Sequence, residues 1–324
     1  MNIQSKIDIK SAAQALVAGN LVVFPTETVY GLGADALNVN SVARIYSIKR
    51  RPITHPIIVH LANLSNIDFW VSELPDYFSL LVSKFVPGPI TFILKKRSSL
   101  DIGYLTGNQN KIGLRIPSHE IAQKLLHEFQ TLNGLGIAAP SANRFGEISN
   151  TNVKRIKKEF ATDFRSGDVI LDGGQSIIGI ESTILDCTEA TPKILRPGFI
   201  TQKEIEDCLK IQISTKQNLN KQKIQTRASG MFLKHYAPRA KVTWSGIPKP
   251  GDGYVGLSNY PVPKGVIVLS LPKNSEEFAQ VLYESFHLAD EIGLENIFIS
   301  IPDEGKLIEA IRDRVERASG FFSL

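Results

Sequence analysis

The feature that most constrains the fold is a series of short apolar segments spread over the first 200 residues. Segments of this length are typical of buried strands, because helices need ten or more residues with a 3.6-residue period. Helical patterns separate only some of them, and parallel neighbours need a long crossover. The sequence therefore predicts an α/β fold with a twisted mixed sheet and flanking helices. The predicted strands span residues 21–24, 57–61, 90–94, 112–116, 135–139, 169–171, 183–185 and 193–195.

A second, smaller α/β unit is predicted after residue 240. The run 265–270 (GVIVLS) predicts a buried strand, a helix begins at Ser275, and a further strand and helix follow at 296–301 and 307–315. This order is typical of a small Rossmann-like domain with a parallel sheet. Residues 210–227 hold five cationic residues and no acidic one, a pattern typical of a linker. The predicted organisation is a catalytic domain at 1–200, a linker at 201–239 and a small domain at 240–324.

Composition narrows the class of protein. The chain has 324 residues, of which 43% are hydrophobic and 21% charged, as in ordinary globular proteins. The net charge of +5 is compatible with anionic substrates or with nucleic acid and is diagnostic of neither. Cys187 and Cys208 are too few for a disulfide framework or a multi-cysteine zinc site. With no signal-peptide pattern and no apolar run of about 20 residues, we expect a cytoplasmic protein with no membrane partner.

Several common catalytic and nucleotide-binding motifs are missing or incomplete. The run 31–36 (GLGADA) fits the pattern G-x-G-x-x-A, but cations stand at 49–51, where a dinucleotide site needs an acidic residue. The sequence contains no P-loop and no G-x-S-x-G nucleophile elbow, and its six histidines have no metal-ligand spacing. We therefore expect no protein metal site, and other residues must hold the phosphates of any nucleotide.

Arg115 is the strongest single candidate for binding an anion. Strand alternation places Lys111, Gly113 and Arg115 on one face, where the glycine leaves room and the guanidinium can form a bidentate pair. The alternative is an exposed strand face. His60 lies on a similar strand, and a lone strand histidine is more often a half-buried structural residue.

Lys49 and Arg51 end a helical pattern that Pro52 stops. They can simply complement the negative end of the helix dipole. Pro52 and Pro56 also stiffen the segment that holds Arg51 and His55, which favours a binding role. The sequence alone supports both interpretations equally.

Small polar residues follow the strand at 135–139. Ser141 and Asn143 come directly after it, Ser149 lies shortly beyond, and Ser182 precedes another strand. Ligand groups in α/β sheets gather at the carboxyl ends of strands. The alternative is a set of plain turns, which favour the same residue types.

The order of these motifs resembles the YrdC-like family, in its long two-domain form, the L-threonylcarbamoyladenylate synthases. The motifs that carry the resemblance are PTETVYGL at 25–32, K-x-RP at 49–52, PIIVH at 56–60, PGPIT at 87–91, RIP at 115–117, SAN at 141–143, ESTI at 181–184 and RPG at 196–198. The run GM-x-x-x-HYAP at 230–238 is similar to the linker signature of the long form. It departs from the family at 228–230 (ASG), where a proline is expected before the glycine.

The resemblance implies a nucleotidyltransferase. L-threonine, bicarbonate or CO2, and ATP with Mg²⁺ give L-threonylcarbamoyladenylate and pyrophosphate, the first step of N6-threonylcarbamoyladenosine formation at position 37 of tRNA. A downstream threonylcarbamoyl-transferase complex is then the expected partner, with direct tRNA binding as a further option. Such a reaction needs charge neutralisation and positioning more than general-base catalysis.

The resemblance also assigns roles to residues. Those expected to act in catalysis are Lys49, Arg51 and Arg115. Those expected around L-threonine are Thr28, His60, Arg115, Ala139 and Ser182. Those expected around ATP are Arg51, His55, Lys111, Ser141, Asn143, Ser149, Arg196 and Tyr236.

Two other functions compete with this one. A tRNA- or double-stranded-RNA-binding module without turnover would also suit a basic chain with an acid-free linker. The enzyme is favoured because the cations lie among Ser, Asn, Gly and Pro, with no aromatic stacking platform beside them. A carbamoyl-adenylate role in hydrogenase maturation would use additional domains that this sequence lacks.

Overall fold

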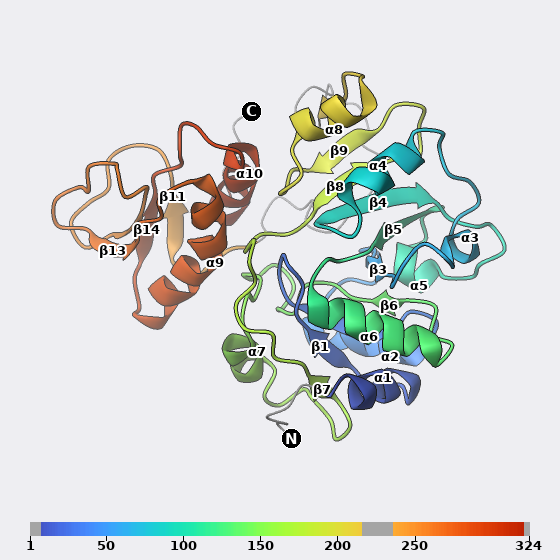
Figure 1. Cartoon of the computed structure of the whole chain (residues 1–324). Helices are drawn as coiled ribbons and strands as arrows, with labels where there is room; N and C mark the ends of the chain where they lie inside the picture. Colours follow the sequence, from blue (N-terminus) through green and yellow to red (C-terminus); the bar gives the residue numbers. More distant parts are fainter. Residues whose placement is uncertain (1–7, 216–235, 321–324) are drawn as a thin grey trace.

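The structure, a computed structural model, describes residues 8–215 and 236–320, and it contains two α/β units that lie side by side (Figure 1). The strands of the larger unit are β1 (Val22–Phe24), β2 (Gly31–Asp35), β3 (Val59–His60), β4 (Ile90–Lys95), β5 (Lys111–Arg115), β6 (Ile137–Ala138), β7 (Val169–Ile170), β8 (Thr183–Asp186), β9 (Lys193–Arg196) and β10 (Ser214–Thr215). They form one mixed sheet in the order β10-β9-β8-β4-β5-β3-β6-β2-β1-β7. The predicted mixed sheet is confirmed.

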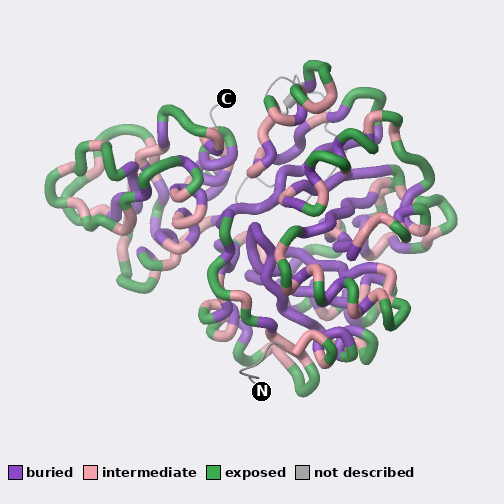
Figure 2. Tube along the Cα trace, viewed as in Figure 1, coloured by how far each residue is buried: buried purple, intermediate pink, exposed green. Residues whose placement is uncertain are grey.

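Helices cover both faces of this sheet. They are α1 (Ile9–Val17), α2 (Val39–Lys49), α3 (Ile67–Trp70), α4 (Phe78–Phe85), α5 (Gly103–Thr106), α6 (Glu120–Thr131), α7 (Val153–Glu159) and α8 (Gln202–Leu209). Helices α1 and α6 pack together over β1 and β6, where Leu16, Leu125 and Phe129 are buried. Helix α2 packs on β2 from the other side, in the cluster that also holds Trp70. The central strands are therefore buried on both faces (Figure 2).

Strand β2 was not predicted, because glycine and alanine fill it. It pairs antiparallel with β1, Val22 opposite Gly33, so the run 31–36 lies within the sheet and does not turn from a strand into a helix. A Cβ atom on Gly33 would lie 2.8 Å from side-chain atoms of Ile137 and Phe24, so packing explains the glycine. The pattern therefore has no role in binding a dinucleotide.

The start of the predicted linker forms regular structure. Helix α8 begins with a capping box between Thr201 and Glu204 and packs on α4, and β10 extends the large sheet beside β9. The GM-x-x-x-H part of the linker signature, at 230–235, lies outside the described residues. The predicted domain limits stay a prediction.

The smaller unit has a four-stranded sheet, and its strands are parallel, as predicted; the strand Gly253–Val255 was not among the predicted strands. Its strands are β11 (Lys241–Thr243), β12 (Gly253–Val255), β13 (Ile267–Ser270) and β14 (Asn296–Ile299), in the order β11-β14-β12-β13. Helices α9 (Ser275–Glu291) and α10 (Ile308–Ser319) accompany it. No helix in the described ranges is long and apolar enough to cross a membrane.

The prediction that the strand at 265–270 is buried is wrong. Strand β13 lies at the edge of the sheet with β12 as its strand neighbour, and Ile267 and Val268 are 41% and 47% exposed. Apolar content predicts a strand here, but position in the sheet decides what the strand buries.

The two units share one hydrophobic core cluster. Val29, Ile148 and Ile180 of the larger unit pack in it with Phe278 and Phe286 of α9. The small unit is therefore docked against the loops that follow β1 and precede β8.

Candidate functional site

A hollow with about 550 Å³ of empty space, part of it open to solvent, lies where loops at the ends of the sheet strands meet. Its walls are built by the segments after β1, α2 and β6, the ends of β3, β5 and β9, the loop before β8, and Tyr236. Its lining residues are Thr26, Thr28, Val29, Tyr30, Gly31, Arg51, Ile58, His60, Arg115, Ala139, Pro140, Ser141, Glu181, Ser182, Arg196 and Tyr236.

His60 and Arg115 form the floor of the hollow. They end the parallel strands β3 and β5, and the register places them directly beside each other. The Nδ1 of His60 and the Nε of Arg115 are buried polar atoms without a hydrogen-bond partner within the described structure. Such atoms are costly unless a ligand or water satisfies them. The adjacent positions of His60 and Arg115 and their unsatisfied nitrogen atoms both indicate that a polar ligand completes the site.

The charges of these two residues differ. Burial and the charge of Arg115 lower the pKa of His60 to about 3, so its imidazole is neutral at physiological pH. Arg115 is held by Glu27, whose Oε1 accepts a hydrogen bond from Nη2 at 2.7 Å. Glu27 also accepts from the Ser118 amide at 3.2 Å, which fixes the carboxylate behind the guanidinium.

Thr28 is placed by its own loop. Thr26 Oγ1 donates to the Val29 carbonyl at 2.6 Å and shares a 2.8 Å hydrogen bond with Thr28 Oγ1. The Tyr30 amide donates to the Asn150 carbonyl at 3.0 Å. The threonine pair is therefore held on the wall of the hollow.

Arg51 and Lys49 leave the end of α2 in different directions. The helix ends at Arg50 in a left-handed conformation, after which Arg51 Nη2 donates to the Pro56 carbonyl at 2.8 Å and its guanidinium lies 5.6 Å from the Phe145 ring centre. Burial lowers the pKa of Arg51 to about 10. Lys49 Nζ donates instead to the backbone carbonyls of Ser141, at 2.6 Å, and Asn143.

Lys49 thus holds the turn that carries Ser141. Its side chain is buried, and burial together with the nearby charge of Arg51 lowers the pKa of the amine to about 7.

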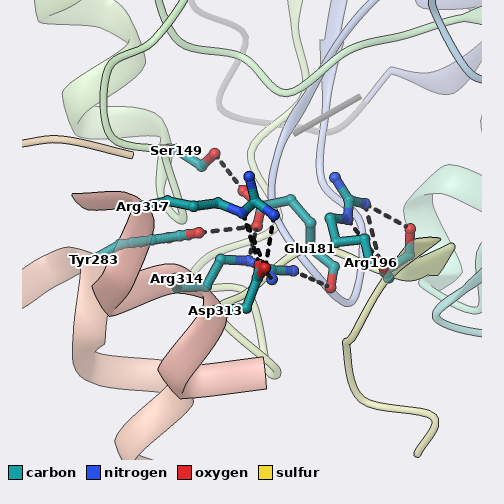
Figure 3. Close-up of polar contacts among 8 residues, drawn as sticks. Ser149, Glu181, Arg196, Tyr283, Asp313, Arg314 and Arg317 are labelled. Carbon is teal, nitrogen blue, oxygen red and sulfur yellow. Dashed lines mark hydrogen bonds and ion pairs between the residues drawn. The ribbon is translucent and has the colours of Figure 1, made fainter. Parts of the chain in front are cut away.

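Ser182 and Arg196 lie side by side on another part of the wall of the hollow. Thr91 Oγ1 and Ser182 Oγ share a hydrogen bond of 2.8 Å. The Nε and Nη2 of Arg196 donate to the Ser182 carbonyl at 3.1 and 2.9 Å, and Nη2 also donates to Ser182 Oγ at 3.1 Å (Figure 3). The guanidinium of Arg196 is therefore fixed beside the serine hydroxyl.

Glu181 is surrounded by donors from both units. It accepts from Ser149 Oγ at 2.5 Å, from Tyr283 OH at 2.9 Å and from Arg314 Nε at 2.9 Å (Figure 3). Burial alone would raise the pKa of Glu181, but the charges of Arg314 and Arg196 and these hydrogen bonds lower it to about 2. Glu181 is therefore ionised, and Arg314 pairs with it.

Two family models match the chain over nearly its whole length. The model of the Sua5, YciO and YrdC proteins, described as "Telomere recombination", matches residues 14–198. The chain belongs to this family. A second model, "Threonylcarbamoyl-AMP synthase, C-terminal domain", matches residues 200–320 and identifies the long, two-domain form.

Curated relatives and a solved structure agree with this membership. The threonylcarbamoyl-AMP synthase of Pyrococcus abyssi is 34% identical, with 99% of this chain and 97% of the relative covered. That of Bacillus subtilis is also 34% identical, with 96% and 93% covered. The structure of Pyrococcus abyssi Sua5 in complex with L-threonine superimposes with a TM-score of 0.84 at 34% identity, covering 97% and 94% of the two chains. The family resemblance noted in the sequence is confirmed.

The structure of this Sua5-family chain brings most of the expected site residues together. Those that line the hollow are Thr28, Arg51, His60, Arg115, Ala139, Ser141, Ser182, Arg196 and Tyr236. Those that do not line it are Lys49, His55, Lys111, Asn143 and Ser149. Of the latter, Lys111 forms an ion pair with Asp186 at 3.2 Å, and the His55 ring packs 4.9 Å from that of Phe145.

Tyr236 joins the site from the segment between the units. It is fully buried, its ring stacks on Tyr283 with centroids 5.5 Å apart, and the guanidinium of Arg314 lies 5.3 Å from its centre. Neither Tyr283 nor Arg314 was predicted, and nothing in the local sequence distinguishes them from other residues of amphipathic helices. Glu27 and Glu181 were also missed as site residues, although both belong to motifs that the sequence pointed out.

The donor set does not form a metal site of its own. In the described part of the chain, no three His, Cys, Asp or Glu residues lie close enough together to hold a metal ion. The carboxylates nearest the hollow, Glu27 and Glu181, are engaged by Arg115 and Arg314. The arrangement favours binding of anionic groups.

Proposed function

We propose that this chain is a threonylcarbamoyl-AMP synthase, a nucleotidyltransferase that forms L-threonylcarbamoyladenylate and pyrophosphate from L-threonine, bicarbonate or CO2, and ATP. This reaction is the first step of N6-threonylcarbamoyladenosine formation at position 37 of tRNA. The observation that carries the proposal is the hollow lined by Arg51, Arg115 and Arg196, in a chain that matches named synthases over its whole length.

L-threonine occupies the floor of the hollow in this proposal. Its carboxylate pairs with Arg115, whose buried Nε has an unsatisfied hydrogen. The neutral imidazole of His60 and the hydroxyls of Thr28 and Ser182 surround the small polar side chain and amine, with Ala139 as the apolar contact. The structure of Pyrococcus abyssi Sua5 in complex with L-threonine supports L-threonine as the ligand, and its placement among these residues is our proposal.

ATP occupies the side bounded by α2 and β9. Arg51, Arg196 and Ser141 contact the phosphates, and Tyr236 closes the hollow over the ligand. Lys49 and Asn143 hold the Ser141 turn from behind, and Ser149 acts through its hydrogen bond to Glu181. Direct phosphate contacts from His55 and Lys111 remain predictions.

The chemistry then needs little proton transfer from the protein. The threonine amine adds to CO2 and loses a proton, which gives an anionic carbamate. A carbamate oxygen attacks the α-phosphorus of ATP, the bond from that phosphorus to the β-phosphate oxygen breaks, and pyrophosphate leaves. The arginines neutralise the charges that gather when the anionic nucleophile meets the triphosphate.

Magnesium enters with ATP as its phosphate-bound partner, where it would neutralise further phosphate charge. A threonylcarbamoyl-transferase complex is the expected consumer of the product, and a cytoplasmic location stays a prediction of the sequence.

The proposal is tested by pyrophosphate release from ATP by the purified chain. We expect release to require both L-threonine and bicarbonate, and mass spectrometry to detect L-threonylcarbamoyladenylate. Glycine in place of threonine is the control for the amino acid. Salt-sensitive tRNA binding with no threonine-dependent pyrophosphate release would overturn the proposal in favour of an RNA-binding module.

A further inference from the structure

The small unit places a charged and an aromatic side chain against Glu181, a residue that lines the hollow. Arg314 from α10 and Tyr283 from α9 both contact Glu181, the residue directly before Ser182 (Figure 3). The side chain of Arg314 is 0% exposed and that of Glu181 8% exposed, so the ion pair is shielded from water. The position of a wall in the large unit therefore depends on residues of the small one.

We propose that Arg314 and Tyr283 are positioning residues of the active site: they hold the Glu181 carboxylate in place and keep Arg196 on Ser182. The inference rests on the proposed function for its kinetic readout. It gives the small unit a role in ATP binding, exercised through the charge of Glu181.

The charge argument compares the two arginines near Glu181. Arg314 forms the direct ion pair, whereas Arg196 donates to Ser182 and acts on Glu181 through its charge. A buried carboxylate that loses its partner is strongly destabilised until another cation or a proton reaches it. Arg196 is the other arginine whose charge already stabilises the ionised Glu181. Without Arg314, we expect the Arg196 side chain to turn toward Glu181 and to lose its hydrogen bonds to Ser182 at the wall of the hollow.

Arg314 and Tyr283 also contact Tyr236, another residue that lines the hollow. The Tyr236 ring stacks on that of Tyr283, and the guanidinium of Arg314 lies 5.3 Å from its centre. Asp313 accepts from Arg314 Nη1 at 2.6 Å and from Arg317 Nη2 at 2.8 Å, which anchors the guanidinium to α10. The small unit thus orients Tyr236 and the Glu181–Ser182 segment together.

The test uses variants of the full chain. Arg314→Met should raise the KM for ATP by roughly ten- to a hundredfold, about the contribution of one charge-assisted hydrogen bond. The double variant Arg314→Met with Glu181→Gln removes the charge that would attract Arg196, so its KM for ATP should return to within about threefold of the wild type. Tyr283→Phe keeps the ion pair and should raise KM only a few-fold.

The matched control is Glu284→Gln. Glu284 lies on the same helix as Tyr283 and joins the units through an ion pair with Arg155 at 3.0 Å, away from the hollow. This variant should leave the KM for ATP unchanged. If Glu284→Gln and Arg314→Met raise the KM for ATP equally, the proposal is overturned, and Arg314 then only helps to dock the two units. A KM of the double variant as high as that of Arg314→Met would also overturn it.

A readout without turnover separates this inference from the proposed function. Hydrogen exchange at the amides of residues 180–183 should accelerate in Arg314→Met and stay at the wild-type rate in Glu284→Gln. Unchanged exchange in Arg314→Met contradicts the positioning role, whether or not the wild type makes the adenylate. If Arg314→Met does not fold, Tyr283→Phe takes its place, and unchanged exchange in that variant is then the contradicting result.

Discussion

Replacing Arg115 by methionine removes the guanidinium that we assign to the threonine carboxylate. The substitution keeps an unbranched side chain in a position that is 5% exposed. It has two separable consequences, because Arg115 both faces the hollow and pairs with Glu27.

The size of each consequence follows from the contacts. A charge-assisted hydrogen bond contributes about 1.5–3 kcal/mol, so threonine affinity should fall by roughly ten- to 150-fold. Loss of the 2.7 Å pair leaves the Glu27 carboxylate buried, with the Ser118 amide as its remaining hydrogen-bond donor in the described part of the chain. Breaking a buried pair costs about 3–5 kcal/mol of stability.

Isothermal calorimetry of L-threonine binding measures the first effect, and urea unfolding measures the second. Arg44→Met is the matched control, since Arg44 pairs with Asp168 at 2.7 Å in the same unit and does not line the hollow. It should lose stability but keep threonine affinity. A folded Arg115→Met protein that binds threonine as the wild type does would refute the assignment.

Three further predictions concern stability. The pKa of His60 is lowered to about 3 in the folded protein, so the unfolded chain binds more protons between pH 3 and 6.5. The free energy of unfolding should therefore fall as the pH drops through this window, by up to about 1.4 kcal/mol per pH unit for this group. Urea unfolding measured from pH 4 to 7 should show that the free energy of unfolding depends less steeply on pH in His60→Asn than in the wild type. Tyr236→Ala empties a fully buried site and should cost about 3–5 kcal/mol in denaturant unfolding, with Tyr236→Phe close to the wild type. Gly179 has a φ of +82°, and a Cβ atom there would lie 2.4 Å from the Cα of Gln280 on α9. Gly179→Ala should therefore weaken the docking of the small unit and speed limited proteolysis between the two units. An unchanged rate of proteolysis would contradict this close packing.

Most strands of the large sheet could be predicted because each is a local apolar run; β10 could not, because Ser214 and Thr215 lie in a polar, cationic stretch. Strand β2 could not, since its small residues are selected by contact with Phe24 and Ile137 and carry no apolar signal. The burial of β13 could not either, because a strand's place in a sheet is decided by the whole chain.

Prediction of the site divides in the same way. Arg115 and His60 end strands, and Ser141 and Ser182 lie beside strand ends, so local pattern and motif order find them. Arg314 and Glu181 are 133 residues apart, and Tyr283 and Glu181 are 102 apart. Each of these contacts exists only after the units dock, so no local pattern in the sequence predicts them.

The balance of buried charge explains why the hollow favours anions. Arg115 is paired with Glu27, and Arg314 with Glu181, so these charges are compensated within the protein. Arg51 donates to the Pro56 carbonyl and Arg196 to the carbonyl and hydroxyl oxygens of Ser182, and burial lowers the pKa of both guanidinium groups. The folded protein thus bears a desolvation cost at these two positions, which a bound polyphosphate would offset. Stabilisation against heat should consequently follow phosphate charge, with ATP above AMP and AMP above adenosine when each ligand is added at the same concentration.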